Sequence, residues 1–582
     1  MEKEEKLEHL RHSLAHLLAS AVLDLYPGTK NTIGPAVSNG FYYDFEFKSP
    51  ISDTDLPKIE AKMRENAQSW KKFENKEVAK DEALNLFNNN AYKQELINEI
   101  SDKSEKITLY KNGNFEDLCR GGHVSDFSEI NLDGFKLSHI AGAYWRGNEK
   151  NKMLTRIYGL AFETKEDLEG YINQQEEAKK RDHKIIGPQM KLFTSSNLVG
   201  SGLPLIAPRG MIIRKAIEDY LWELHKKKGY SRVWTPHIAK EALYETSGHA
   251  AKFGDELFRV SGKEDKFILK PMNCPHHMQI FADNQFSYRD MPVRYFEPAT
   301  VYRDEKSGQL GGLTRVRAIT QDDGHLFCTV DQLGQEIATI VDIIKTFYTT
   351  MGMIDGYWVR LSLRGDDKNK YLGSDEVWEK AENTLTRVCE EQNLPYKPAK
   401  DEAAFYGPKL DFMFKDAIGR EWQLATIQCD FNLPERFDLS FTNSDGKKER
   451  PVVIHRAISG SIERFMGVMI EHFAGNFPLW LSPNQITVLP ISDNHLEFAK
   501  NVFDEISNSD IRVEIDDSKE GLGKKIRGAR EMRTPYWCVI GDNEVAHSTV
   551  TLEHRTKGKI GEIKIDELIK LLRDESDNKK IS

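Results

Sequence analysis

Residues 302–328, with the sequence YRDEKSGQLGGLTRVRAITQDDGHLFC, carry the side chains on which the interpretation of the chain depends. The segment opens with Arg303 and Glu305, passes through a glycine-rich turn and returns through Arg315 and Arg317. Two antiparallel strands joined by that turn would place arginines from both strands on one surface. Arginine suits phosphate and carboxylate, because its planar guanidinium donates two parallel hydrogen bonds. The alternative is a solvated hairpin with surface ion pairs.

The same segment continues directly into Gln321, Asp322, Asp323 and His325. A hairpin without a function does not need so many potential ligands and hydrogen-bonding groups, so the segment favours a binding site. The pattern R-x-E, a loop, then R-V-R-x-x-T-Q-D-D-x-H resembles the second signature motif of class II aminoacyl-tRNA synthetases, in the form carried by threonyl-tRNA synthetases.

The length and composition indicate a multidomain globular protein. A chain of 582 residues is too long for one core, and 39% hydrophobic with 30% charged residues is ordinary. We expect no membrane segment and no signal peptide, and hence a cytoplasmic protein. The six cysteines are scattered singly, which favours a reducing compartment. The net charge of −10 argues against general nucleic-acid binding, although a local basic face is still possible.

Near the N-terminus, the spacing of leucine and alanine predicts an amphipathic helix over residues 7–26. His12 and His16 are four residues apart and share a face of that helix. Alone they are better explained as ordinary surface histidines. Cys119 and His123 are also four apart, in a glycine loop, and the two pairs together could form a zinc site or a water-activating hydrolytic site.

These N-terminal motifs resemble the editing domain of threonyl-tRNA synthetases. The resemblance rests on H-S-x-A-H, on N-G-F-Y-Y-D at 39–44, on D-x-C-R-G-x-H, and on the runs that start at Gly142 and Asn151. Many family members begin with a small extra β-rich domain, and we expect it to be missing here. The resemblance implies an editing site made of His12, His16, Lys93, Asp117, Cys119 and His123.

Residues 165–190 are rich in charge and are expected to form an exposed connecting helix that ends at Gly187-Pro188. A helix over 211–228 and a strand over 233–236 follow. Together they resemble the first class II motif, which forms the dimer interface in the family, so the resemblance implies a homodimer. Another amphipathic helix over 335–351 is expected to cover the sheet.

Residues 406–414 and 421–428 are expected to form two strands, with Lys409 and Asp411 on the face opposite the apolar side chains. Gln423 and Gln428 are five apart, so a regular strand would place them on opposite faces. If both line one pocket, the strand must bulge between them. A third strand, over 452–456, leads through Gly460 to a helix whose N-cap is Ser461. The pattern G-S-x-E-R resembles the third class II motif.

After Pro483 strands and helices alternate, which predicts a compact α/β domain with parallel pairing. Strands are expected over 486–491, 511–515, 536–540 and 548–552, with helices at 496–506, 522–533 and 565–572. In the family a domain at this place reads the anticodon. The anticodon-binding residues implied are Lys524, Arg533 and Glu544.

Cys274, His325 and His455 are too far apart in the sequence to indicate a metal site by spacing. The resemblance assigns them as the ligands of one zinc ion per subunit. Three protein ligands leave a coordination position open for substrate. Threonine can bind there through its amino and hydroxyl groups, whereas valine has no hydroxyl. Serine keeps the hydroxyl and lacks only a methyl group, which allows a pocket to discriminate against it by only roughly 10–200-fold. That limited discrimination is a physical reason for a second, hydrolytic site.

The resemblance also implies roles around ATP and threonine, with Mg²⁺ as the companion of ATP. Activation joins two anions, so positive charge must be arranged around them. The catalytic residues implied are Arg303, Arg464 and Lys409; those for ATP are Arg303, Glu305, Arg315, Gln423, Gln428, Ser461 and Arg464; those for threonine are Gln321, Asp323, Tyr406 and Lys409.

We therefore expect an α+β multidomain protein. Its parts are an α+β editing domain (1–165), a linker helix (166–190), a class II antiparallel-sheet catalytic domain (191–481) and an α/β anticodon-binding domain (482–582). The expected function is threonine–tRNA ligase with removal of serine from mischarged tRNA(Thr), and the partners are tRNA(Thr), L-threonine and ATP. The alternatives are a sister class II synthetase such as prolyl, or a catalytically silent RNA-binding or regulatory relative.

Overall fold

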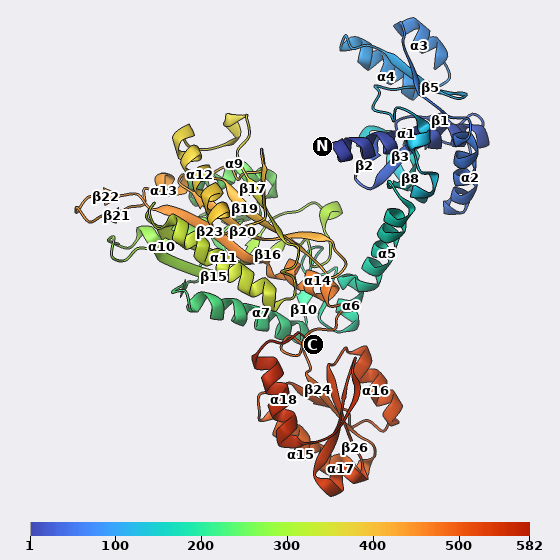
Figure 1. The fold of residues 1–582 in the computed structure, drawn as a ribbon. Coiled ribbons are helices and arrows are strands. Elements are labelled where there is room, and N and C mark those ends of the chain that lie inside the picture. Colours follow the sequence, from blue (N-terminus) through green and yellow to red (C-terminus); the bar gives the residue numbers. More distant parts are fainter. Residues whose placement is uncertain (1, 582) are drawn as a thin grey trace. The chain divides into compact units, whose positions relative to one another are not determined.

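A computed structural model describes residues 2–581, in two compact units that divide between Glu176 and Glu177 (Figure 1). Each unit has cores of its own. Among residues 2–581, no helix combines the length and the apolar character that crossing a bilayer requires.

In the first unit a long helix, α1 (Glu2–Leu25), packs against a sheet in the order β1-β3-β8-β7. Leu14, Leu17 and Leu18 of this helix share a core with Phe41 and Phe45 of β3. The predicted amphipathic helix exists, but its middle is not amphipathic, because every residue from 13 to 22 is buried. The strands are β1 (Lys30–Asn31), β2 (Ala36–Val37), β3 (Gly40–Glu46), β7 (Phe135–Tyr144) and β8 (Met153–Ala161), and α2 (Leu56–Ala67) packs beside α1.

The same unit contains a smaller sheet in the order β4-β5-β6. Ala83 of α3 and Ile97 of α4 form a small core with Leu109 of β5. The sheet presents Asp117 and the loop after it toward α1, since Val124 donates its backbone N–H to Ser13. The elements are β4 (Glu74–Glu77), α3 (Lys80–Leu86), α4 (Ala91–Asp102), β5 (Thr108–Asn112) and β6 (Phe115–Leu118).

The predicted connecting helix is two helices. Helix α5 (Lys165–Arg181) ends before Asp182, and α6 (His183–Gln189) begins after it. The single-helix prediction over 166–190 is wrong, because Asp182 leaves the helical conformation and its side chain accepts from the backbone of Lys184, which starts a new helix. Pro188 lies inside the second helix and does not end the first.

The second unit is built on an eight-stranded, largely antiparallel sheet in the order β11-β15-β16-β23-β20-β19-β17-β18. One large core joins this sheet to helices α7, α11, α12 and α14. The strands are β11 (Ser231–Arg232), β15 (Val293–Tyr302), β16 (Ala318–Cys328), β17 (Trp358–Ser362), β18 (Tyr396–Ala399), β19 (Lys409–Lys415), β20 (Glu421–Asp430) and β23 (Val452–Ser461). The helices are α7 (Pro208–Lys226), α11 (Leu333–Thr350), α12 (Asp375–Glu391) and α14 (Ile462–His472).

One predicted strand is missing. Residues 233–236 are not in a strand, because pairing with β15 stops at Arg232 and Trp234 is 73% exposed. Beside the large sheet lies a small one in the order β12-β14-β13, followed in the chain by a short helix, α10. The bounds here are β12 (Ile238–Lys240), α8 (Glu241–Ser247), α9 (His249–Phe253), β13 (Arg259–Ser261), β14 (Lys266–Leu269) and α10 (Cys274–Ala282).

The C-terminal part of the second unit, drawn in red tones in Figure 1, is the predicted α/β fold. Its strand order is β25-β24-β26-β27-β28, and the parallel pairing is confirmed for β24 with both β25 and β26. Strand β28 and helix α17 were not predicted. The elements are β24 (Ile486–Pro490), α15 (Leu496–Ser507), β25 (Val513–Ile515), α16 (Leu522–Glu531), β26 (Tyr536–Ile540), α17 (Asp542–His547), β27 (Thr549–His554), β28 (Gly558–Lys564) and α18 (Ile565–Asp577).

Candidate active site

A cavity of about 750 Å³ opens on the large sheet of the second unit. Side chains on one face of β16, β20 and β23 form its floor. The loop between β15 and β16, together with the start of α14, forms its walls. The structure brings together here most of the residues expected from the sequence: Arg303, Glu305, Arg315, Gln321, Asp323, His325, Tyr406, Gln423, Gln428, His455, Ser461 and Arg464.

The arginines do not sit on paired strands as the sequence predicted. Strand β15 ends at Tyr302 and β16 begins at Ala318, so Arg303, Arg315 and Arg317 lie in the connecting loop. Side chains help to hold the loop: Arg317 donates to the carbonyl oxygen of Glu305, and Arg315 binds the Glu305 carboxylate at 2.7 Å. One backbone hydrogen bond, from the N–H of Arg303 to the carbonyl oxygen of Arg317, spans the base of the loop. The predicted common arginine surface is confirmed for Arg303 and Arg315, which line one cavity, but Arg317 is not among the lining residues.

Two partly buried arginines, Arg303 and Arg464, face the cavity. No ion pair of Arg303 or Arg464 is found within the described part of the chain, and the Nε atom of each lacks a hydrogen-bond partner. Burial lowers the pKa of Arg303, and burial together with the charge of Arg315 lowers that of Arg464. Because arginine remains charged even so, an anion in the cavity would relieve both groups.

The predicted irregularity between Gln423 and Gln428 is confirmed. In the β19–β20 ladder Phe412 pairs with Ala425 but Met413 pairs with Gln423, so Leu424 is an extra residue. The bulge moves Gln423 to the same side of the sheet as Gln428, and both line the cavity. Asp411 then fixes Gln423, accepting a hydrogen bond from its amide at 2.8 Å.

Lys409 lies beside this cavity and is not among the residues that line it. Its ammonium group pairs with the fully buried Asp411 at 2.8 Å, on the face opposite Leu410 and Phe412, as the alternation predicted. Asp411 also accepts from Arg360 and Ser362. The catalytic role of Lys409 stays a prediction.

Cys274, His325 and His455 meet beside the cavity, which the two histidines line. All three are buried, and their ligand atoms lie within 4.8 Å of one another. Cys274 begins α10, whereas His325 and His455 are directly opposite each other on β16 and β23. The Nδ1 atom of His455 has no partner, so this orphaned nitrogen and the thiol fit a soft or borderline metal ion.

Three further residues support this cluster and were missed in the sequence. His277 Nδ1 lies 2.8 Å from His325 Nδ1, and Glu297 Oε2 lies 2.9 Å from His277 Nε2. Asp430 Oδ2 lies 2.7 Å from His455 Nε2. Such outer partners orient metal-binding histidines. In the sequence only His277 offers a signal that could have found it, because it follows Cys274 by three residues, whereas Glu297 and Asp430 look like ordinary strand residues.

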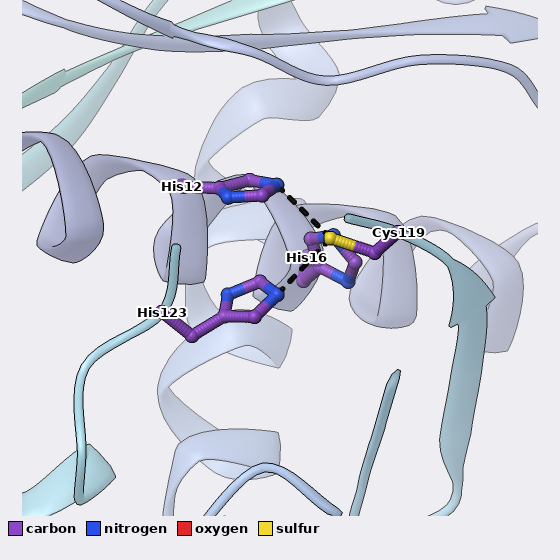
Figure 2. Close-up of side chains that lie close together, drawn as sticks. All are labelled: His12, His16, Cys119 and His123. Carbon is purple, nitrogen blue, oxygen red and sulfur yellow. Dashed lines mark hydrogen bonds between the residues drawn. The ribbon is translucent and has the colours of Figure 1, made fainter. Parts of the chain in front are cut away.

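A second cavity, of about 350 Å³, lies in the first unit. Five of the six residues expected for editing line it, and the sixth, His123, contacts His12, His16 and Cys119. Figure 2 shows the sulfur of Cys119 between the rings of His12 and His123, 3.5 Å from His12 Nε2 and 3.3 Å from His123 Nε2. His16 is 3% exposed, which excludes the interpretation of that residue as an ordinary surface histidine. The five lining residues are His12, His16, Lys93, Asp117 and Cys119.

Burial keeps this cluster uncharged. It lowers the pKa of His12, lowers that of His123 to about 2 with help from neighbouring histidines, and raises that of Cys119 to about 11. The charges in the pocket belong instead to Lys93 and Asp117, a buried pair 2.6 Å apart. Neutral imidazoles keep a lone pair that can accept a hydrogen bond from water, so the cluster can orient a water molecule beside the fixed charges of Lys93 and Asp117.

The three expected anticodon residues are not joined by any described hydrogen bond or ion pair. Lys524 pairs with Glu520 on the surface of α16, and Glu544 caps α17 through the backbone N–H of Gly541. The guanidinium of Arg555, another cation of this domain, donates to the carbonyl oxygens of Asn476 and Phe477. Arg555 therefore holds backbone rather than standing free for RNA.

Three family models match the chain. The tRNA synthetase class II core domain (G, H, P, S and T) matches residues 258–473, and an anticodon binding domain matches 485–575. The threonyl and alanyl tRNA synthetase second additional domain matches 107–158, within the first unit. The antiparallel sheet, the cavity on it and these matches define the chain as a class II aminoacyl-tRNA synthetase.

Threonine–tRNA ligases from two bacteria resemble the chain over nearly its whole length. That of Porphyromonas gingivalis is 49% identical over 97% of this chain and 87% of its own, and that of Gloeobacter violaceus is 46% identical over 98% and 92%. The chain belongs to the threonine–tRNA ligase family, which are aminoacyl-tRNA ligases that use ATP and Mg²⁺. The alternative of a catalytically silent relative is not favoured.

Solved structures agree. The RNA binding domain of a threonyl-tRNA synthetase from Cryptosporidium parvum aligns with a TM-score of 0.65 at 36% identity, over 68% of this chain and 98% of that one. A prolyl-tRNA synthetase from Giardia lamblia aligns at 0.53 over 70% and 80%, but at 18% identity this likeness shows only a common fold.

Proposed function

We propose that this chain activates L-threonine with ATP, transfers it to the 3′ end of tRNA(Thr), and removes serine attached by mistake. One observation carries the proposal: Cys274 converges with His325 and His455, and these two histidines line the same cavity as Arg303 and Arg464. Candidate metal ligands for the amino acid and unpaired arginines for ATP thus lie around one cavity.

Zinc is the ion that the cluster fits, because one thiolate and two imidazoles are its preferred donors. When bound, zinc would offer open coordination to the amino and hydroxyl groups of threonine. Asp323 lines the cavity beside this cluster, and its Oδ2 already accepts a hydrogen bond from Asn273 at 2.9 Å, which orients the carboxylate to accept the threonine hydroxyl. Valine, which lacks that hydroxyl, would leave both partners unsatisfied.

The ATP site is assigned to the loop between β15 and β16 and to α14. Arg303 would hold the α-phosphate and the threonine carboxylate, and Arg464 would hold the triphosphate from α14, so developing charge meets preorganised cations. Glu305, whose side chain is only 12% exposed, would accept from the adenine amino group. Arg315 and Mg²⁺ would bind the terminal phosphates of ATP. Gln423, Gln428 and Ser461 would contact the nucleotide, and Gln321, Tyr406 and the adjacent Lys409 would contact threonine.

The second cavity is assigned to serine removal. Pocket contacts that differ by one methyl group separate threonine from serine by only about 10–200-fold, so the synthetic site needs a corrective step. The neutral cluster of His12, His16, Cys119 and His123 would direct water at the ester, and Lys93 beside Asp117 would stabilise the charge that develops.

Assembly and place in the cell are inferred from surface and composition. Met211 on α7 is 44% exposed, and Trp234, shortly after β11, is 73% exposed. Both lie in the segment that resembles the first class II motif, so we assign a homodimer contact there. All six cysteines are free, which supports a reducing compartment such as the cytoplasm. We place domain boundaries near residues 165, 190 and 481, with tRNA bound through Lys524, Arg533 and Glu544 at the C-terminal domain.

Aminoacylation of a tRNA(Thr) transcript tests the proposal. The purified chain should charge it with threonine in the presence of ATP and Mg²⁺, and Arg464→Ala should abolish charging without loss of the fold. A prolyl-specific enzyme would charge tRNA(Pro) instead, and a silent relative would charge neither transcript; either result would refute the proposal.

A further inference from the structure

The side chain of His183 joins two parts of the ATP site that are far apart in the sequence. His183 begins α6 and is 3% exposed. Its Nδ1 atom lies 2.6 Å from Glu471 Oε1, near the end of α14. Its Nε2 atom lies 3.0 Å from the backbone nitrogen of Leu313, in the loop that carries Arg315. Both ring nitrogens are therefore in use.

The two partners determine which nitrogen carries the proton. The N–H of Leu313 can only donate, so Nε2 accepts and Nδ1 must donate to Glu471. Burial alone would raise the pKa of Glu471, but the hydrogen bonds from His183 and the charge of Arg420 lower it, so the group is a carboxylate. A neutral ring with both nitrogens occupied leaves no ligand for a metal ion, although Asp182, His183 and Glu471 lie close enough together to suggest one.

The packing around this ring is close. At Gly312, φ is +59°, and a Cβ atom there would lie 2.3 Å from His183 Nε2. At Gly467 of α14, a Cβ atom would lie 3.3 Å from Leu313 Cβ. Position 312 therefore requires glycine, because of its positive φ and because a side chain would collide with the His183 ring. The loop, the ring and α14 contact one another directly.

The contact with Leu313 acts on the part of the loop that carries Arg315. Residues 311–315 form a tight turn, in which Thr314 donates to the carbonyl of Gly311 and Gly311 donates to that of Arg315. On the other side, Arg464 and Glu471 are seven residues, or two turns, apart on α14 and so share a face. Holding Leu313 against Glu471 thus sets the distance between Arg315 and Arg464.

We propose that His183 is a positioning residue for ATP: its ring ties the 311–315 turn to α14, so that Arg315 and Arg464 face the triphosphate at a fixed separation. The inference rests on the ATP roles of these two arginines proposed above.

Two substitutions separate the two hydrogen bonds in an ATP–pyrophosphate exchange assay. His183→Asn keeps a donor near Glu471 but cannot reach Leu313, so the KM for ATP should rise about tenfold, the effect of one lost hydrogen bond, while the KM for threonine stays constant. His183→Gln can place its oxygen near the Nε2 position and should recover most of that loss. His225→Asn is the control, because His225 is equally buried but bonds only within α7, to Leu221.

A double substitution tests whether His183 acts through Arg315. Arg315→Ala should itself raise the KM for ATP, and in that background His183→Asn should add less than twofold. A full additive effect, or an equal rise of both KM values in His183→Asn, would overturn the positioning role. If Arg315→Ala leaves the KM for ATP unchanged, the proposed ATP site is wrong instead, so the two failures are distinguishable.

Discussion

Asp430 and His455 share a buried hydrogen bond, with Oδ2 2.7 Å from Nε2, and the Nδ1 atom on the opposite side of the imidazole has no partner. An ionised carboxylate can only accept, so Nε2 carries the proton and Nδ1 presents its lone pair toward Cys274 and His325. This is the tautomer that a metal ligand must have. The fold therefore prepares His455 for a cation.

Asp430→Asn should weaken zinc binding by about 10–100-fold. Its other oxygen accepts from the backbone of Asn432 and Leu433, which the carbonyl of asparagine can still do. The new amide would face Nε2 as a donor and push the histidine proton to Nδ1. Competition with a chelator measures the affinity. Asp416→Asn, a buried carboxylate that binds Arg420, is the control, and equal affinities in both variants would contradict the prediction.

Cys274→Ser should lose zinc and threonine activation together, because a hydroxyl is a poor substitute for a thiolate ligand. The fold should survive, since serine is almost isosteric. Cys389→Ser is the matched control: Cys389 is also buried, in the core on α12, and lies outside the ligand cluster. Metal content and ATP–pyrophosphate exchange measured on both variants decide the matter. Full exchange by zinc-depleted Cys274→Ser would show that the metal assignment is wrong.

The sequence predicted the elements of the site better than their local geometry. Alternation placed Lys409 and Asp411 correctly on one face, because burial of the other face determines strand orientation. It failed for Arg303 and Arg315, whose loop is shaped by side-chain contacts with Glu305 that have no period. The helix break at Asp182 was missed for a similar reason: a cap competes locally with a continuous helical pattern.

His12→Ala/His16→Ala should abolish serine removal and leave threonine activation intact, because the candidate zinc cluster lies in the other unit. The variant should accumulate Ser-tRNA(Thr), and deacylation of pre-formed Ser-tRNA(Thr) measures the step directly. If the histidines only pack α1, both activities would fall together with stability. Clearance of serine at the parent rate would refute the hydrolytic role.

The first unit should lose stability below pH 6.5. Burial lowers the pKa of His16 well below its ordinary value, and His12 and Lys93 lower it further, so the folded unit keeps this ring neutral. The unfolded chain binds a proton there near pH 6.5, so stability present at pH 7 is lost as the pH falls, with a slope that approaches about 1.4 kcal/mol per pH unit well below pH 6.5.

His16→Phe removes the imidazole that takes up a proton on unfolding. Between pH 6.5 and 5.5 the parent should therefore lose about 1 kcal/mol more than this variant in the free energy of unfolding of the first unit. Urea-dependent proteolysis resolved to peptides of residues 4–176 provides the measurement on the full chain. Parallel pH profiles for the parent and the variant would show that His16 titrates normally in the folded unit.

ATP–pyrophosphate exchange with threonine, serine and valine, before and after removal of zinc, tests the account most directly. The expected result is exchange with threonine, weaker exchange with serine by about 10–200-fold, background with valine, and loss of all exchange on zinc removal with recovery when zinc is returned. Exchange with valine at the threonine rate, or exchange with threonine that survives complete zinc removal, would contradict it.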